Sequence, residues 1–151
     1  MGPNPTDRGC CGSKLNVMSD SAGTPIAVIV SAANEYDVNF ILPLVFTKFP
    51  KVAGAKGRPR TKPQMVRADT GYTSKDVLDV LASAGIRRAI PQRGQANTEN
   101  LDHERWPVER AIAWLKQFRR VGIRRDRLDS IYEATVAMAC SMIAYRKLNR
   151  A

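Results

Sequence analysis

The stretch from residue 64 to residue 91 constrains the fold most, because it reads as a strand, a helix and a second strand. "QMVRAD" predicts a strand that ends in Asp69, and "IRRAIP" predicts the second one. Between them, "TGYTSKDVLDVLASAG" predicts a helix with a capping box from Thr73 to Asp76, and Gly85 ends it. Two strands joined through a helix pair in parallel by a right-handed crossover. We therefore expect an α/β fold.

A β-hairpin is expected upstream of this unit. "KLNVMSD" and "PIAVIVSAA" flank a glycine-containing turn and predict antiparallel strands from about Ser13 to Ala33. The second run is apolar almost throughout, which predicts a strand covered on both faces. Next, "NEYDVNFILPLVF" predicts a short helix with Asn34 as its N-cap. The pattern thus favours one mixed sheet with flanking helices.

The C-terminal part is expected to be helical. Residues 91–104 are polar and irregular, and a helix resumes around "WPVERAIAWLKQF", with Pro107 in its first turn. After a basic connector, Ser130 is predicted to cap a final helix. Residues 134–145 of that helix are apolar around nearly the whole circumference, which predicts burial. The length of 151 residues suits a single domain over residues 1–151.

The chain is strongly basic. Lys and Arg number 24 against 14 for Asp and Glu, which gives a net charge of +10. Such a charge attracts polyanions, and nucleic acid is the first candidate, although basic runs also serve solubility. Residues 50–63, "PKVAGAKGRPRTKP", have no periodicity and predict a basic surface loop suited to phosphate contacts. The basic side chains of this loop that we expect to contact nucleic-acid phosphates are Lys56, Arg58, Arg60 and Lys62.

The sequence gives no sign of secretion or of a membrane. No apolar run is long enough to cross a bilayer, and the N-terminal residues lack the hydrophobic core of a signal peptide. We therefore expect a cytoplasmic protein with no membrane partner. Cys10, Cys11 and Cys140 match neither a zinc-ligand spacing nor a disulfide framework, so they are expected to be reduced bystander thiols.

Two carboxylates stand out in this basic chain. Asp69 ends a predicted strand, and Glu109 lies 40 positions later on a predicted helix. Two such acids suit phosphoryl transfer with Mg²⁺ or Mn²⁺, because carboxylate oxygens hold these ions at the reacting phosphate. Lys116 lies seven residues after Glu109, on the same helix face. The alternative is that Asp69 caps a turn and that Glu109 is a first-turn acid favoured by the helix dipole.

The residues resemble those of the DDE transposases of bacterial insertion sequences, in particular the family that includes insertion sequence five. The resemblance covers nearly the whole chain in the family's order. The segments that carry it are "GPNPTDRGCCGSKLNVMSDSAGTPIAVIVSAANEYD", "LPLV", "KGRPRTKP", "RADTGY" and "ERWPVERAIAWLKQFRRVGIRRDR".

The resemblance implies a ribonuclease H-like fold and a catalytic role for both acids. Asp69 corresponds to the second catalytic aspartate, in an Asp-x-Gly-Tyr motif that Gly71 and Tyr72 complete. Together with the catalytic glutamate, Glu109, it would bind Mg²⁺ or Mn²⁺. The implied reaction nicks the end of the element and then joins the freed 3′ hydroxyl to target DNA.

The resemblance also implies side chains that bind DNA. Arg105, Glu109 and Lys116 match the Tyr-x2-Arg-x3-Glu-x6-Lys signature of the family, while the tyrosine position holds Asp102. The arginine and the lysine of this signature are expected to contact the DNA backbone. Arg119 and Arg120, which follow, would hold the same DNA.

One departure from the family is expected to matter. Its first catalytic aspartate lies on the first strand, upstream of the segment that resembles "GPNPTDRG", and this chain begins with that segment. The resemblance therefore implies the C-terminal part of a catalytic domain, with a partial fold and unpaired strand edges. Little or no strand transfer is expected from the chain alone. Such a product is a truncated remnant or the second reading frame of an element that makes its enzyme by frameshift fusion.

Two alternatives remain beside the catalytic hypothesis. The chain could be a non-catalytic DNA-binding fragment that inhibits or complements a full-length transposase, since its basic segments suffice for phosphate binding. A nuclease of the same fold is the other alternative. The expected partners are the ends of the element, target DNA, and an upstream reading-frame product or a full-length transposase. The expected location is the bacterial cytoplasm, at the nucleoid when the protein is bound to DNA.

Overall fold

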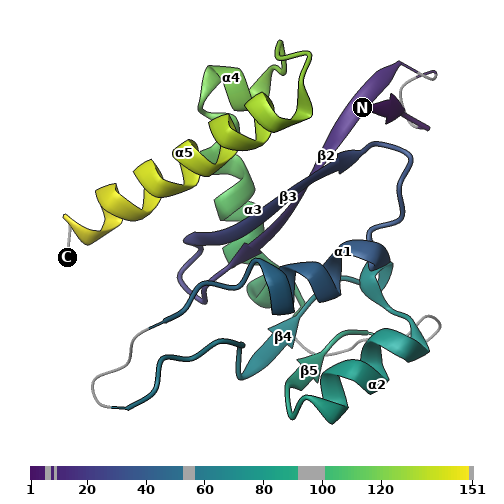
Figure 1. The fold of residues 1–151 in the computed structure, drawn as a ribbon, viewed down its shortest axis with the longest axis vertical. Helices are drawn as coiled ribbons and strands as arrows, with labels where there is room; N and C mark the ends of the chain where they lie inside the picture. Colours follow the sequence, from purple (N-terminus) through teal and green to yellow (C-terminus); the bar gives the residue numbers. More distant parts are fainter. Residues whose placement is uncertain (6–7, 9, 53–56, 92–100, 150–151) are drawn as a thin grey trace. The chain divides into compact units, whose positions relative to one another are not determined.

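Two small sheets with their own helices form the mixed α/β architecture of the chain in a computed structural model (Figure 1). Contacts divide the chain into a first unit, Met1–Asn34 with Asn100–Ala151, and a second unit, Glu35–Glu99. The expectation of one domain over residues 1–151 stays a prediction. The structure describes residues 1–5, 8, 10–52, 57–91 and 101–149, and only the backbone of 101–106.

The sheet of the first unit is antiparallel, with the order β1-β2-β3. Its strands are β1 (Gly2–Pro3), β2 (Cys11–Ser19) and β3 (Pro25–Ala32). β2 and β3 form the predicted hairpin, which is thereby confirmed. Residues on both faces of β3 are buried or half-buried, as its apolar sequence predicts.

An aspartate and a glycine shape the turn between β2 and β3. The Asp20 carboxylate accepts hydrogen bonds from the backbone N–H groups of Ala22 and Thr24, at 2.9 and 2.7 Å. Gly23 has a φ of 77°, which glycine adopts without steric cost. Lys147 donates to the carbonyl of Ala22 at 3.0 Å and so ties the last helix to this turn.

Three helices complete the first unit: α3 (Leu101–Lys116), α4 (Arg119–Gly122) and α5 (Asp129–Leu148). α3 begins at Leu101, so the expectation that Pro107 lies in the first turn is wrong. A proline inside a helix removes one backbone hydrogen bond. α3 continues nonetheless, because Ala111 and Leu115, which follow the proline, are completely buried and their packing stabilises the helix.

The core of the first unit lies between one face of the hairpin and the helices. Its buried residues are Leu115, Val121, Tyr132, Val136, Ala139 and Ile143. Half-buried side chains from alternate positions of the two strands pack against them, namely Leu15, Val17, Val28 and Val30. Such alternation is expected for a strand face that meets helices.

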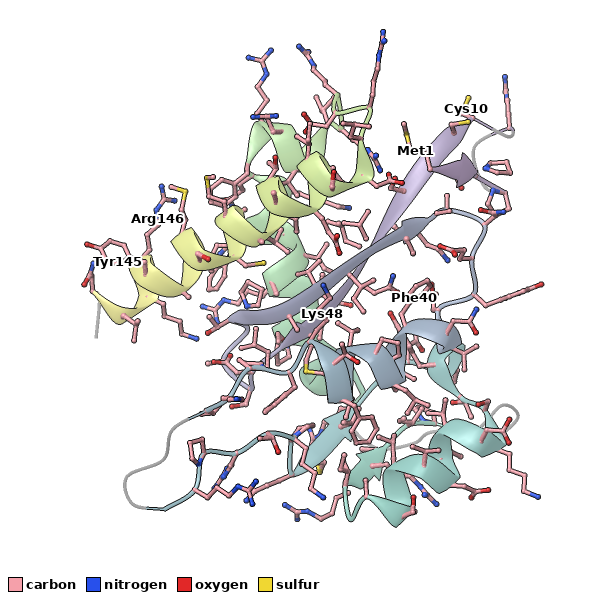
Figure 2. All side chains as sticks on the ribbon, viewed as in Figure 1. Met1, Cys10, Phe40, Lys48, Tyr145 and Arg146 are labelled. Carbon is pink, nitrogen blue, oxygen red and sulfur yellow. The ribbon has the colours of Figure 1, made fainter. Side chains whose placement is uncertain are left out.

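The prediction that α5 is buried around its circumference is wrong. Only its face with Val136 and Ile143 is buried, whereas Met138 is 66% exposed and Tyr145, labelled in Figure 2, is 68% exposed. The apolar composition of residues 134–145 did not reveal that the hairpin and α3 cover only one side of α5. The N-cap is Leu128 and not Ser130, since the helix begins two residues earlier than predicted.

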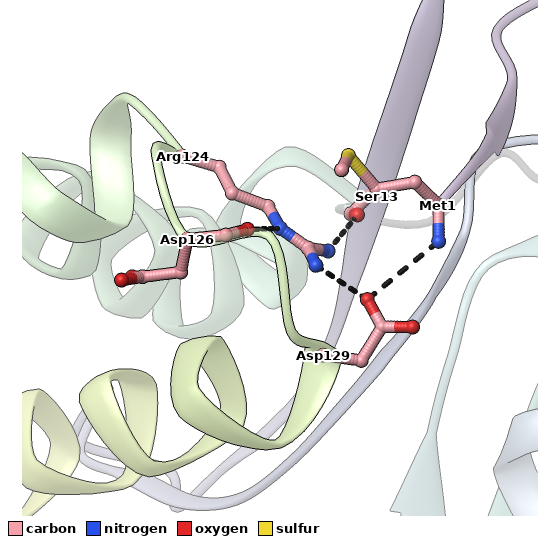
Figure 3. A network of polar contacts seen from close by, with 5 residues as sticks. All are labelled: Met1, Ser13, Arg124, Asp126 and Asp129. Carbon is pink, nitrogen blue, oxygen red and sulfur yellow. Dashed lines mark hydrogen bonds and ion pairs between the residues drawn. The ribbon is translucent and has the colours of Figure 1, made fainter.

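Arg124, in the connector between α4 and α5, ties the start of α5 to β2 (Figure 3). Its guanidinium donates to the Ser13 hydroxyl, to the Asp129 carboxylate and, at 3.0 Å, to the backbone carbonyl of Asp126. The guanidinium carbon also lies 4.7 Å from the centre of the Tyr132 ring. One side chain thus joins the sheet, the connector and the last helix.

Stability at acidic pH should depend on Asp129. Its hydrogen bond with Arg124, assisted by the N-terminal ammonium 3.6 Å away, holds the pKa of this carboxyl below its ordinary value of 3.8. A carboxyl whose pKa is lowered on folding stabilises the folded state at pH values above its ordinary pKa. This contribution is lost as the pH falls through the pKa that the carboxyl has in the folded state. In thermal unfolding at stepped pH, Asp129→Asn should therefore melt below wild type above pH 5, about one unit above that value. The difference should shrink on acidification.

Asp79→Asn, at an exposed position of the second unit, serves as the matched control. It removes the same charge without touching Arg124. A difference between Asp129→Asn and wild type that stays constant down to the lowest pH would contradict the proposed linkage.

The second unit begins with α1 (Val38–Leu42), which continues directly as the π-helical segment η1 (Pro43–Thr47). The N-cap is Asp37, so the prediction of Asn34 is wrong: the chain makes a turn first, in which the Asn39 N–H bonds to the Tyr36 carbonyl. Pro43 has no N–H to continue the α-helical pattern, which fits the change to a wider helix at this residue.

The predicted β-α-β unit is confirmed. β4 (Met65–Arg67) pairs in parallel with β5 (Arg87–Ala89), and α2 (Lys75–Ser83) connects them. The cap of α2 is Ser74 and not Thr73, because the Ser74 hydroxyl accepts from Val77 N–H at 3.2 Å. Gly85, with a φ of 69°, follows the helix end as expected.

The expected single mixed sheet is divided into two. Among the described strands no backbone pairing joins β2 and β3 to β4 and β5. From Ser13 onward, β2 pairs only with β3, and β4 pairs only with β5. Each of these strands therefore has an edge to which no described strand pairs.

The described cysteines are free thiols, as predicted. Burial raises the pKa of Cys140 to about 11, so this thiol stays protonated and unreactive near neutral pH. Among the described residues, no helix combines the length and the apolar character needed to span a lipid bilayer.

Candidate functional site

Asp69 lies just after β4 and caps a short 3-10 turn, η2 (Thr70–Tyr72). Its Oδ1 accepts the backbone N–H of Thr70 at 2.7 Å and the Thr70 hydroxyl at 3.2 Å. The residue is exposed. Asp69 thus caps the turn, and this cap fixes the carboxylate at the end of the strand. Whether the carboxylate also acts in catalysis stays a prediction.

Tyr72 of the same turn faces two carboxylates. Burial, followed by the negative charges of Asp37 and Asp69, raises the pKa of its hydroxyl to about 12. The phenol is therefore neutral at physiological pH. Asp37 also lies near Gly71, since its Oδ2 is 3.6 Å from where a Cβ on that glycine would be. No motif points to Asp37, which comes 32 positions before Asp69 in the sequence.

Glu109 lies on the exposed face of α3. Ala113 and Lys116 are exposed on this face too, whereas Ala111 and Leu115 are completely buried. The prediction that Glu109 and Lys116 share a face is confirmed. Because α3 begins at Leu101, Glu109 is in the middle of the helix, and its alternative reading as a first-turn acid is wrong.

The two acids belong to different units, Asp69 to the second and Glu109 to the first. Their carboxylate oxygens are the donor type that Mg²⁺ and Mn²⁺ prefer. The part of the chain that the structure describes, however, contains no group of three or more ligand-type side chains. Among the described residues, no third ligand-type side chain joins either acid in such a group.

The basic side chains after Glu109 line the end of α3 and the short helix α4. Lys116, Arg119 and Arg120 are exposed. Arg120 forms an ion pair of 2.7 Å with Asp126, so part of its charge is already engaged. Lys116 and Arg119 present their charge to solvent.

The predicted loop of residues 50–63 is closed by an antiparallel bridge between Val52 and Arg60. Arg58 and Arg60 are exposed and suited to phosphate contacts. Lys62 donates from Nζ to the carbonyl of Ala84 at the end of α2, a structural contact that the sequence did not reveal. Lys56 and the side chain of Arg105 lie outside the described residues.

Comparisons with known proteins identify the family. The model of the family described as "Transposase DDE domain" matches residues 2–144. The chain belongs to the DDE transposase family. The predicted resemblance is thereby confirmed. A protein of Burkholderia cepacia named as a transposase for insertion sequence element IS402 is 41% identical over 150 residues, which are 99% of this chain and 71% of that protein.

No solved structure matches this DDE transposase chain significantly. The family connects the chain with DNA transposition, and transposases bind DNA. DDE transposases generally use divalent metal ions. The roles of individual residues, including Asp69 and Glu109, remain predictions.

Proposed function

We propose that this DDE transposase chain acts at the ends of an insertion sequence, by metal-dependent phosphodiester hydrolysis and strand transfer. Asp69 and Glu109 would be two of its catalytic acids. The observation that carries the proposal is the family match over residues 2–144, which includes both acids. The net charge of +10 supports DNA as the substrate.

A ribonuclease H-like arrangement belongs to the same proposal. Its support is the order of the elements: an antiparallel hairpin, then the parallel strand β4, with an acid at the end of β4 and another on α3. β2 from Ser13 onward and β4 each have an edge without a described partner strand, as strands taken from a larger sheet would.

The described side chains would divide the work between DNA binding and chemistry. Lys116 shares the exposed face of Glu109 and would hold a phosphate next to it. Arg119 would extend this contact along the backbone, as guanidinium groups bind phosphate through two parallel hydrogen bonds. Asp69, fixed by the cap on Thr70, would present a carboxylate of defined orientation.

We expect the chain alone to bind DNA but to show little or no strand transfer, because Asp69 and Glu109 are the two acids of this chain that match catalytic positions of the family. The test is cleavage of terminal DNA of the element with Mg²⁺ or Mn²⁺. It compares the chain with a chimera that adds the segment of the IS402 relative outside the match. The chimera should nick DNA, and Asp69→Asn or Glu109→Gln should abolish nicking.

DNA affinity and circular dichroism serve as controls, since both exposed substitutions should leave binding and folding intact. Nicking that survives both substitutions would contradict the assignment of the acids. If neither the chain nor the chimera cleaves while both bind DNA, the alternative of a non-catalytic DNA-binding fragment would replace the catalytic proposal. The observation that favours this alternative is the exposed charge of Lys116 and Arg119, which suits phosphate contacts whether or not the acids act.

A further inference from the structure

The connector from α4 to α5 presents its side chains alternately to solvent and to the protein. Ile123, Arg125 and Arg127 are exposed, and Ile123 is exposed to 60%. Between them, the side chains of Arg124 and Asp126 are only 10% and 13% exposed. Alternation of this kind is typical of an extended chain with one buried face. We call the three exposed side chains, Ile123, Arg125 and Arg127, the 123–127 edge.

The buried side of the connector is anchored at both inward positions. Arg124 donates to Ser13 and Asp129, as Figure 3 shows. Its guanidinium also lies over the Tyr132 ring. Asp126 accepts from Arg120 at 2.7 Å. These contacts come from the sheet, from α4 and from α5, so they fix the connector against three elements.

The backbone before the edge is constrained as well. The Tyr132 hydroxyl donates to the Val121 carbonyl at 2.8 Å. A Cβ on Gly122 would lie 2.6 Å from the carbonyl oxygen of Lys116, so only glycine allows the chain to pass so close. A surface held in this way loses little conformational entropy on binding, which is the condition for a preorganised interface.

The chemistry of the edge suits duplex DNA. Arg125 and Arg127 carry exposed positive charge, while the neighbouring Asp126 carboxylate points inward and is paired with Arg120. Exposed arginines gain affinity from phosphates by releasing counterions. Ile123 adds an exposed apolar side chain beside them, and proteins that bind the minor groove often insert an apolar side chain such as isoleucine between base steps.

We propose that the 123–127 edge contacts duplex DNA directly. Arg125 and Arg127 bind backbone phosphates, and Ile123 enters the adjoining groove. This inference rests on the proposed function in so far as DNA is the ligand. The edge adds DNA contacts to those expected from Lys116, Arg119 and Arg120.

Binding of the full chain to a DNA duplex of mixed sequence, measured by fluorescence anisotropy at several salt concentrations, tests the two arginines. Arg125→Gln with Arg127→Gln should lower affinity and reduce the slope of log affinity against log salt by roughly 1.8, at about 0.9 per phosphate. The matched control is Lys75→Gln with Arg87→Gln, two exposed charges on α2 and β5. It removes the same charge and should leave the slope unchanged.

Ile123→Ala tests the groove contact. It should weaken DNA binding several-fold with no change of slope, because an apolar contact releases no counterions. Ile131→Ala, at a position 46% exposed on α5, should bind as wild type does. Wild-type affinity of Ile123→Ala would overturn the groove contact.

Three results would overturn the proposal for the arginines: equal slopes for the two double variants, no DNA binding by the wild-type chain, or a loss confined to an RNA duplex of the same sequence. The last result would make the edge an RNA surface. Failure of the chimera to cleave, with the slope change intact, would affect only the proposed catalytic function. The two proposals therefore fail separately.

Discussion

Leu115→Ala is expected to lower the free energy of unfolding by roughly 2–5 kcal/mol, the usual cost of emptying a buried leucine site. Leu115 is completely buried in the core of the first unit, between the hairpin and α5. The loss combines the transfer energy of the missing methyl groups with the cavity that remains. Because a domain has only about 5–15 kcal/mol of net stability, urea unfolding should show a large shift of the midpoint.

Met138→Ala on α5 is the control for this prediction. Its side chain is 66% exposed, so the substitution should change stability by no more than about 0.5 kcal/mol. Equal effects of the two substitutions would contradict the division of α5 into a buried and an exposed face. A loss below about 1 kcal/mol for Leu115→Ala would mean that the site collapses without a cavity.

The elements that sequence reasoning predicted well are those whose signals are local. The β-α-β unit from Met65 to Ala89 follows from strand composition and a glycine stop, and Gly85 indeed has a positive φ. The hairpin follows from two strand runs around a turn that contains Gly23. In each case, the residues that decide the structure are neighbours in the sequence.

The errors arise where tertiary contacts decide. α5 is apolar all round, but only one face meets the hairpin and α3, so Met138 and Tyr145 stay exposed. Pro107 lies within α3 because burial of Ala111 and Leu115 stabilises the helix around it. No local pattern contains this information.

The candidate site shows the same limit. Motif spacing singled out Asp69 and Glu109, and it placed Lys116 on the face of Glu109. The approach of Asp37 to Tyr72 depends on the folding of α1 against η2, which joins residues far apart in the chain. The inward turn of Arg124 likewise depends on Ser13, more than a hundred residues away. Composition alone would group Arg124 with its exposed basic neighbours.

DNA binding by the whole chain should fall steeply with salt. A site that neutralises about six phosphates loses affinity roughly a thousandfold between about 50 and 200 mM salt, with a slope near −5. Each unit exposes basic side chains suited to phosphate contacts: Lys116, Arg119, Arg125 and Arg127 in the first unit, and Arg58 and Arg60 in the second. Equilibrium titrations of a DNA duplex across this range measure the slope.

The slope separates phosphate contact from other modes of DNA binding. Binding through stacking or groove contacts alone would change little with salt, because no counterions are released. A slope weaker than about −2 would contradict a multi-phosphate interface in a chain of net charge +10. A slope near −5 that Arg58→Gln with Arg60→Gln reduces by about 1.8 would show that the second unit contributes about two phosphate contacts, since these arginines lie in that unit.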